Sequence, residues 1–248
     1  MRILVVNPNT TASMTEKAGA AARAIAAPGT EIIAANPAMG PASIEGYYDE
    51  ALAVPGLLEV IAAHGRAVPG IDGVVIACFD DVGLDAARCL SAVPVVGICE
   101  AAMKTATLLG GRFSVVTTMP RSVPALEHLA ERYGVAGRCR VRAAGVPVLA
   151  LEDPASGAVE RVRETIRHAI AEDGAESVVL GCAGMADLAR ALTAEMGMPV
   201  VDGVTAAVKL VEGLAALGLR TGKTGGYAFP LPKPYAGDMA RFAPAPQP

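Results

Sequence analysis

The chain has 248 residues, of which 52% are hydrophobic and 19% are charged, which is the composition of a compact globular protein and not of a disordered one. Its formal net charge of −4 gives no reason to expect nucleic acid or an acidic membrane surface as a partner, so a small molecule is expected instead. The five cysteines form no CxxC pair, and no apolar run is long enough for a secretory signal or a membrane span. These features predict a soluble cytoplasmic protein with reduced thiols.

Short runs of Val, Ile and Leu alternate with longer Ala-rich stretches at helical spacing along the chain. This pattern predicts an α/β protein whose parallel strands are covered by helices on both faces. Strands are expected over residues 2–7, 31–36, 73–78, 93–98, 113–118, 146–149, 177–181 and 200–201. Helices are expected over residues 11–25, 48–64, 83–90, 100–109, 123–133, 158–172, 186–196 and 204–217. The Gly- and Pro-rich tail from Thr221 is expected to pack irregularly on the surface or against a neighbouring subunit.

One pattern of strands and helices occurs twice in the sequence, over residues 72–109 and again over residues 176–217. In each copy, a short apolar strand ends in a cysteine, Cys78 or Cys182, and a Pro-Val-Val strand follows after nearly the same number of residues. The repeat predicts a duplicated fold in which the two cysteines occupy equivalent places.

Polar and thiol side chains follow the predicted strands in both halves. In open α/β sheets, ligands bind beyond the carboxyl ends of the strands, so a site is expected where these side chains meet. The residues at such ends are Asn7, Asn9, Thr10, Cys78, Thr117, Thr118 and Cys182. Two such sets of strand ends facing each other would enclose a cleft.

The cysteines divide into two classes. A cysteine is often just a small buried apolar residue, and Cys89, Cys99 and Cys139 are interpreted in that way. Cys78 and Cys182 each end a strand before a helix, where backbone N–H groups and the helix dipole favour a thiolate. A matched pair of thiols on opposite sides of a cleft predicts two-sided proton transfer.

Two carboxylates, Asp80 and Asp81, come directly after the first cysteine motif. They could act as an acid or a base, but capping of the helix that follows is the better interpretation.

Five motifs resemble those of hydantoin racemases in the aspartate/glutamate racemase superfamily. They are Asn7-Pro8-Asn9-Thr10, Gly40-Pro41-Ala42-Ser43-Ile44-Glu45-Gly46, Ile76-Ala77-Cys78-Phe79-Asp80-Asp81, Val116-Thr117-Thr118 and Leu180-Gly181-Cys182-Ala183-Gly184-Met185. The resemblance covers nearly the whole chain. It implies two pseudosymmetric lobes, residues 1–98 plus 205–248 and residues 99–204, each with a parallel sheet flanked by helices and with the active site in the cleft between them. It also implies an isomerase that moves one proton without cofactor or metal and assembles as a homo-oligomer, either a dimer, a tetramer or a hexamer.

The resemblance assigns roles by position. Cys78 and Cys182 would be the catalytic acid/base pair. The ring of a hydantoin or of allantoin would be held by Asn9, Ser43, Ile44, Phe79, Thr117, Thr118, Ala183 and Gly184. None of these residues is a Lys or Arg, which suits a neutral ring better than an amino acid. Many relatives have Gly-Asp-Pro where this chain has Asp80-Asp81-Val82, and this departure would alter the lip of the pocket.

Alternatives to a hydantoin racemase stay open at this point. Allantoin racemases share almost all of these motifs, and maleate isomerases also have two cysteines. Arylmalonate decarboxylases need only the second cysteine, so the presence of Cys78 argues against that activity. Outside the enzymes, the alternative is a non-catalytic protein that binds a small ligand in the same cleft.

Overall fold

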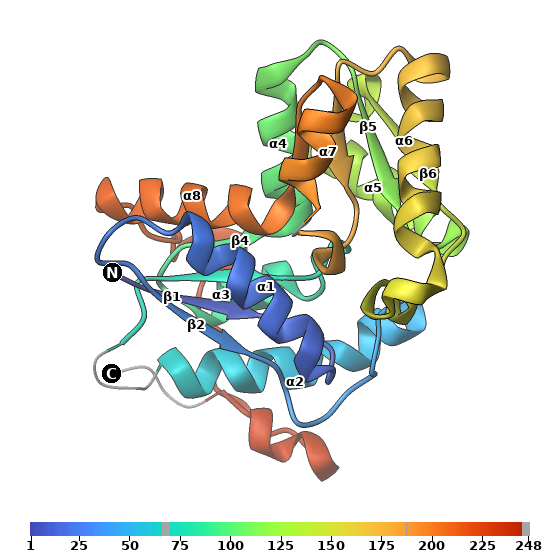
Figure 1. Cartoon of the computed structure of the whole chain (residues 1–248). Helices are drawn as coiled ribbons and strands as arrows, with labels where there is room; N and C mark the ends of the chain where they lie inside the picture. The colour runs from blue at the N-terminus through green and yellow to red at the C-terminus, as the bar shows by residue number, and fades with distance from the viewer. Residues whose placement is uncertain (66–69, 187, 245–248) are drawn as a thin grey trace.

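The computed structural model describes residues 1–65, 70–186 and 188–244 and contains two parallel sheets (Figure 1). In spatial order, the first sheet consists of β2 (Glu31–Ala35), β1 (Arg2–Val6), β3 (Gly73–Ile76) and β4 (Val95–Gly97). The second consists of β6 (Cys139–Ala143), β5 (Phe113–Thr117), β7 (Ser177–Leu180) and β8 (Val200–Asp202). The strand order is the same in both sheets, as the repeat predicts; below, lobe 1 is the part built on the first sheet and lobe 2 the part built on the second.

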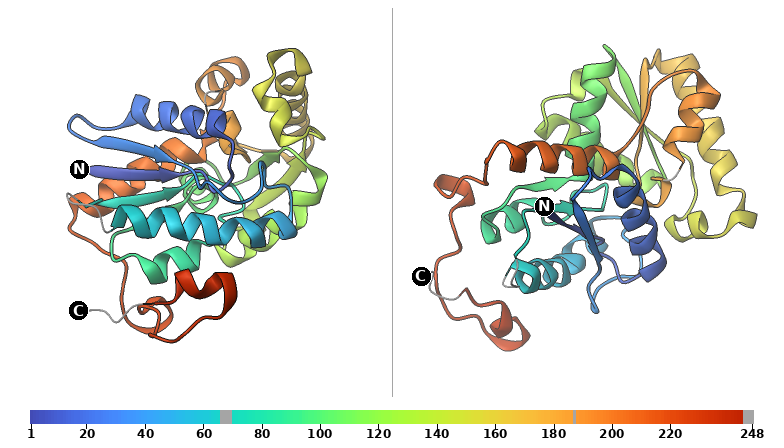
Figure 2. Two further views of the ribbon diagram at one scale, coloured as in Figure 1. Left: turned by 90° about the horizontal axis from the view of Figure 1, so that it is seen from below. Right: turned by 60° about the vertical axis from the view of Figure 1, so that its left-hand side comes forward.

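Helices cover both faces of each sheet, as expected for parallel strands. The α-helices are α1 (Ala12–Ile25), α2 (Tyr47–Gly65), α3 (Leu84–Leu90), α4 (Ile98–Leu109), α5 (Val123–Arg132), α6 (Ala158–Asp173), α7 (Ala189–Met196) and α8 (Gly203–Ala216). The 3₁₀ helices are η1 (Pro120–Ser122), η2 (Ala136–Arg138), η3 (Val148–Glu152), η4 (Pro154–Ser156), η5 (Ala183–Met185), η6 (Gly225–Tyr227) and η7 (Gly237–Phe242). In Figure 2, left, α1 and α8 lie on one side of the first sheet, and α2 and α3 lie on the other. Within the described residues, no helix is both long and apolar enough to cross a bilayer.

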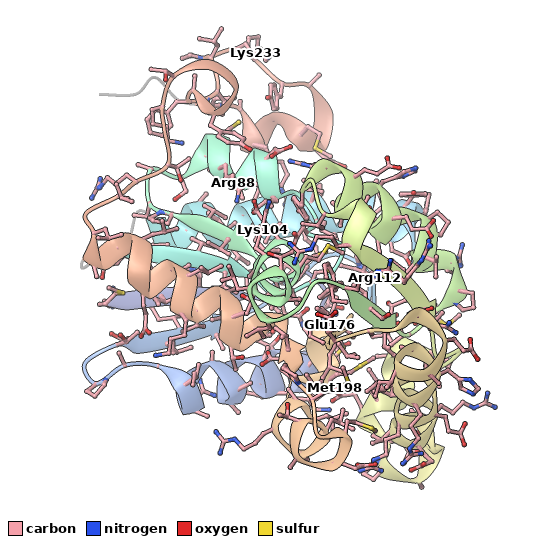
Figure 3. All side chains as sticks on the ribbon, turned by 90° about the horizontal axis from the view of Figure 1, so that it is seen from above. Arg88, Lys104, Arg112, Glu176, Met198 and Lys233 are labelled. Atoms are coloured by element: carbon pink, nitrogen blue, oxygen red, sulfur yellow. The ribbon has the colours of Figure 1, made fainter. Side chains whose placement is uncertain are left out.

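The helix that leaves each sheet packs on the other one. Helix α4 follows β4 of lobe 1 but contacts β7 and β8, whereas α8 follows β8 of lobe 2 but contacts β3 and β4. The two helices also pack against each other (Figure 1), and Figure 3 shows α4, with Lys104 labelled, at the centre of the molecule. Whether the lobes divide after residues 98 and 204 as domains stays a prediction.

The central strands β1, β3, β5 and β7 are buried on both faces, and alternate side chains enter different cores. In β1, Ile3 and Val5 face a core that also contains Val115 and Val179 of lobe 2, together with side chains of α4 and α8. Leu4 of the same strand faces a separate core beneath α2 and α3. The largest core is therefore continuous through both lobes.

One predicted strand is wrong. Residues 146–149 were expected to form a strand, but β6 is Cys139–Ala143, and η3 begins at Val148. Strand β6 lies at the edge of its sheet and pairs only with β5 among the described strands. An edge strand tolerates charged side chains, so Arg140 and Arg142 interrupt the apolar run by which buried strands are recognised.

Candidate active site

A pocket lies beyond the carboxyl ends of the central strands of both lobes. Strands β1 and β3 lead into it from lobe 1, and β5 and β7 lead into it from lobe 2. Its volume is about 410 Å³, including space that is open to solvent. It is lined by Asn7, Asn9, Met14, Ile44, Ala77, Cys78, Phe79, Asp80, Thr117, Thr118, Ser122, Val148, Gly181, Cys182 and Ala183. These lining residues include no Lys, Arg or His.

The two predicted thiols meet in this pocket. Cys78 follows β3 by two residues, and Cys182 follows β7 by two residues, so they occupy equivalent places in the two lobes. Both are partly buried. Each thiol accepts a hydrogen bond from the backbone N–H two residues further on, Asp80 for Cys78 and Gly184 for Cys182. The two lobes thus present the same thiol and amide pair to one space.

Burial raises the pKa of both thiols, whereas the sequence predicted a lowered pKa. Desolvation, and then the negative charge of Asp80, raise the pKa of Cys78 well above its ordinary value. Desolvation also raises the pKa of Cys182 to about 11, although the Gly184 N–H opposes this shift. As expected, a backbone N–H group lowers the pKa of each thiol, but desolvation outweighs it, so the net shift is opposite to the expected one.

The carboxyl group of Asp80 belongs to the pocket wall. Its pKa is raised to about 7, mainly by desolvation and then by the charges of Glu50 and Asp81. No residue in the described ranges donates a hydrogen bond to this carboxylate, so the predicted helix cap is wrong for Asp80.

Asp81 does cap a helix, but not the one that follows it. Its buried carboxylate accepts hydrogen bonds from the N–H groups of Cys99 (3.0 Å) and Glu100 (2.9 Å) at the start of α4, and from the Tyr133 hydroxyl (2.5 Å). Asp81 also has a left-handed backbone with φ of 46°. The space it fills exists because residue 97 is a glycine, where a Cβ would lie 2.2 Å from Asp81 Oδ1. The loop after Cys78 is therefore anchored to α4, the helix that contacts lobe 2.

Asn7 fixes the orientation of Asn9. The side-chain Nδ2 of Asn7 donates to Asn9 Oδ1 (2.8 Å) and to Thr15 Oγ1 (3.0 Å), and Asn9 Oδ1 also accepts from the Thr11 N–H (2.9 Å). The Nδ2 group of Asn9 has only a long contact to the Met14 sulfur (3.6 Å), which is a weak acceptor. Asn9 can therefore donate a hydrogen bond into the pocket.

Lobe 2 supplies hydroxyl groups. Thr117 donates to the Gly181 carbonyl oxygen (3.2 Å), whereas the hydroxyls of Thr118 and Ser122 have no hydrogen-bond partner among the described residues. Both residues are largely buried, and both line the pocket wall. A ligand with carbonyl or N–H groups would satisfy them.

Contacts between the lobes close the pocket over its apolar side. Ile44 of lobe 1 and Val148 of lobe 2 both line it and are buried. They are held by Glu45, whose Oε1 accepts from the Val148 N–H (3.0 Å), and by an ion pair between Lys17 and Glu152 (2.9 Å).

The structure brings most of the predicted residues together. Cys78, Cys182, Asn9, Ile44, Phe79, Thr117, Thr118 and Ala183 line the pocket. Ser43 and Gly184 lie outside the lining, although Gly184 contributes its N–H to Cys182. Their roles toward a substrate stay predictions.

Asn7 was expected at the site from its strand-end position but had been assigned no role, and it lines the pocket. The lining residues that were not predicted are Met14, Ala77, Asp80, Ser122, Val148 and Gly181. The position of Asp80 beside a cysteine was a usable signal. Val148 comes from a segment that had been interpreted as a strand.

Residues 3–211 match the family model described as Asp/Glu/Hydantoin racemase. Hydantoin racemase from Rhizobium meliloti is 50% identical over 238 residues, which cover 96% of this chain and 98% of that protein. The structure of allantoin racemase from Klebsiella pneumoniae has a TM-score of 0.95 and 53% identity, and the match covers 99% of this chain and 100% of that one. Glutamate racemase from Francisella tularensis, at 16% identity and a TM-score of 0.65 over 91% of this chain and 84% of that one, shares the fold.

Proposed function

Because the chain belongs to the Asp/Glu/hydantoin racemase family, we propose that it interconverts the D and L forms of 5-monosubstituted hydantoins without a cofactor. Cys78 and Cys182 are the acid/base pair in this proposal. The observation that supports it best is the convergence of two equivalent thiols, one from each lobe, on a pocket lined by no Lys or Arg.

The reaction follows from the chemistry of the ring. A thiolate removes the C5 proton, and the electron pair of the C–H bond moves onto the neighbouring carbonyl oxygen to give an enolate. The opposite thiol then returns its own proton to C5 from the other face, and the two sulfurs have exchanged roles. A thiolate with a raised pKa is the stronger base, which suits a weakly acidic C–H.

The polar groups of the wall suit the enolate and the ring. Asn9 Nδ2 and the Thr118 hydroxyl are donors that could stabilise the enolate oxygen, since fixed donors in a dry pocket act strongly on developing charge. Phe79, Ile44 and Ala183 would contact the ring, and Thr117 would hold it through its hydroxyl. Ser43 and Gly184 would act through the backbone around the pocket. An amino acid substrate would need cationic partners for its carboxylate, and this lining offers none.

Allantoin is the second candidate substrate. It is itself a hydantoin with a ureido group at C5, so the same chemistry applies. The similarity to the allantoin racemase structures favours it, at 53% identity for Klebsiella pneumoniae and 45% for Pseudomonas fluorescens.

The proposal includes a homo-oligomeric state and a location in the cytoplasm. Family membership favours a homo-oligomer, and the five cysteines, all free in the structure, suit the reducing cytoplasm. Light scattering of the purified protein would give the subunit number.

Circular dichroism tests the proposed activity. L-5-benzylhydantoin and, separately, one enantiomer of allantoin are incubated with the purified protein without added cofactor or metal and compared with a blank. Decay of the hydantoin signal well above the blank is expected. Faster decay of allantoin would make allantoin the better substrate, and decay at the blank rate for both would contradict ring racemisation.

A further inference from the structure

The carboxylate of Asp80 is an unusual wall group for a pocket that binds a neutral ring. It lines the pocket, yet no residue in the described ranges donates a hydrogen bond to it. Glu50, whose charge acts on Asp80, has a buried Oε1 atom with no partner among the described residues. Two partly buried carboxyl groups, Asp80 and Glu50, thus lie near enough for Glu50 to raise the pKa of Asp80, and no described residue donates a hydrogen bond to Asp80 or to Glu50 Oε1.

The raised pKa values of both carboxyl groups show that their charged forms are unfavourable in this arrangement. Burial raises the pKa of Glu50, and Asp49 raises it further; burial and Glu50 raise the pKa of Asp80 to about 7. A donor or a positive charge placed against Asp80 would offset this cost, whereas an apolar or anionic group would increase it.

Asp80 is also close to the place where a reacting carbon must lie. Its N–H donates to the Cys78 sulfur, and its charge raises the pKa of both Cys78 and Cys182. The carbon that exchanges its proton has to lie between the two thiols. The substituent on that carbon is therefore within reach of the Asp80 side chain.

We propose that Asp80 selects the C5 substituent, favouring one that ends in N–H donors, such as a ureido, guanidino or ammonium group. This inference rests on the proposed racemisation of hydantoins. The buried apolar side chains of Ile44, Val148 and Met14 line the rest of the pocket and would contact the alkyl portion of the substituent.

The test uses hydantoins that differ at the end of the C5 side chain. These are 5-(4-aminobutyl)hydantoin, 5-butylhydantoin, 5-(2-carboxyethyl)hydantoin and allantoin, assayed at pH 8, where Asp80 is mostly ionised. For the wild type, kcat/KM is expected to be about tenfold higher for aminobutyl than for butyl, and lowest for carboxyethyl. In Asp80→Asn, the aminobutyl-to-butyl ratio is expected to fall about tenfold and the carboxyethyl compound to improve.

The exposed Glu59 on α2 provides a matched control. Glu59→Gln removes one negative charge away from the pocket lining, so its substrate ratios should equal those of the wild type. Equal ratios in wild type and Asp80→Asn would overturn the proposal. A fall of the same size in Glu59→Gln would overturn it as well, because it would point to net charge as the cause.

A binding measurement separates this inference from the proposed reaction. The same compounds are tested for protection of the thiols from iodoacetamide, in wild type and Asp80→Asn. In one outcome no compound is racemised, but the aminobutyl compound protects the wild-type thiols better than the butyl compound and this difference is lost in Asp80→Asn. The proposed racemisation is then wrong, and the recognition of the substituent by Asp80 holds. If racemisation occurs and neither selectivity changes, the reaction holds and the role of Asp80 is wrong. If the compounds are neither racemised nor protective, both are wrong.

Discussion

The loops after Cys78 and Cys182 have the same thiol and the same N–H donor, but they differ in charge. In lobe 1 the donor is Asp80, followed by Asp81; in lobe 2 the donor is Gly184, which has no side chain. A Cβ added at Gly184 would lie 3.3 Å from Leu151 Cδ1, so a larger residue there would require the Leu151 side chain to shift. The two lobes thus share the arrangement of a thiol and an N–H donor, but only the loop in lobe 1 carries acidic side chains.

The N-terminal caps of α4 and α8, the helices that each pack on the sheet of the other lobe, also differ. Helix α8 is capped by Asp202, the residue that ends β8 and accepts a hydrogen bond from the Thr205 N–H (3.0 Å). The equivalent end of β4 is Gly97, and the carboxylate that caps α4 comes from Asp81 instead. Lobe 2 caps α8 with an adjacent residue, whereas in lobe 1 the cap of α4 comes from the loop after Cys78 and anchors that loop.

The largest expected effect comes from removing either thiol. If the two sulfurs act as a pair, Cys78→Ser and Cys182→Ser should each reduce the racemisation rate by about 10³-fold, within the usual range for general acid/base groups. Circular dichroism of a hydantoin substrate measures this loss. Cys89→Ser, which changes a cysteine outside the pocket, should keep the wild-type rate. Full activity in either pocket variant would contradict a paired mechanism.

A smaller effect should follow from filling the space that Asp81 occupies. Gly97→Ala would place a Cβ 2.2 Å from Asp81 Oδ1, so the cap of α4 must shift and the free energy of unfolding should fall by about 2 kcal/mol. Gly213→Ala in α8 meets no atom within 4 Å and should raise it by up to about 1 kcal/mol. Urea unfolding of both variants measures the difference. If Gly97→Ala were as stable as the wild type, the close contact of residue 97 with Asp81 would not contribute to stability.

Asp80→Asn should make the two thiols more reactive. Loss of the charge removes a cause that raises the pKa of both, so more thiolate is present at a given pH. Alkylation by iodoacetamide at pH 8 should become several-fold faster, and the pH dependence should move to lower pH. Since Cys182 is the less perturbed thiol in the wild type, it should be alkylated before Cys78, which peptide mass spectrometry can show. An unchanged pH profile would mean that Asp80 is neutral at this pH.

The smallest effect concerns stability against pH. The folded pKa of Asp80 is about 7, above the value of about 3.9 for an unperturbed Asp, so folding favours the protonated form. The stability contributed by that form is present at low pH and is lost as the pH rises through about 7. Asp80→Asn should therefore raise Tm by about 2–4 °C at pH 8, with the gain shrinking toward pH 5. A gain that grew toward pH 5 would contradict the raised pKa.

The sequence was sufficient for those parts of the site that local patterns specify. The two cysteines, Asn9 and Thr118 follow buried strands, so the parallel topology alone brings their positions to one edge. The cap of α4 could not be predicted, because Asp81 and Gly97 meet only in three dimensions. Strand β6 was missed since its alternating arginines suit an edge strand. Ser122 and Val148 lie in 3₁₀ helices that are too short to give a periodic signal in the sequence.

The core shared by both lobes has a mechanical consequence. Side chains of α4 and α8 belong to the same hydrophobic core as Val5 of lobe 1 and Val179 of lobe 2. Rotating one lobe against the other would therefore disrupt the packing of this core. Hinge bending is then a costly way to admit a substrate. The Val148–Glu152 segment (η3) is held to lobe 1 by Glu45 and Lys17 through polar contacts of partly exposed side chains, and we expect this segment to move when a substrate enters.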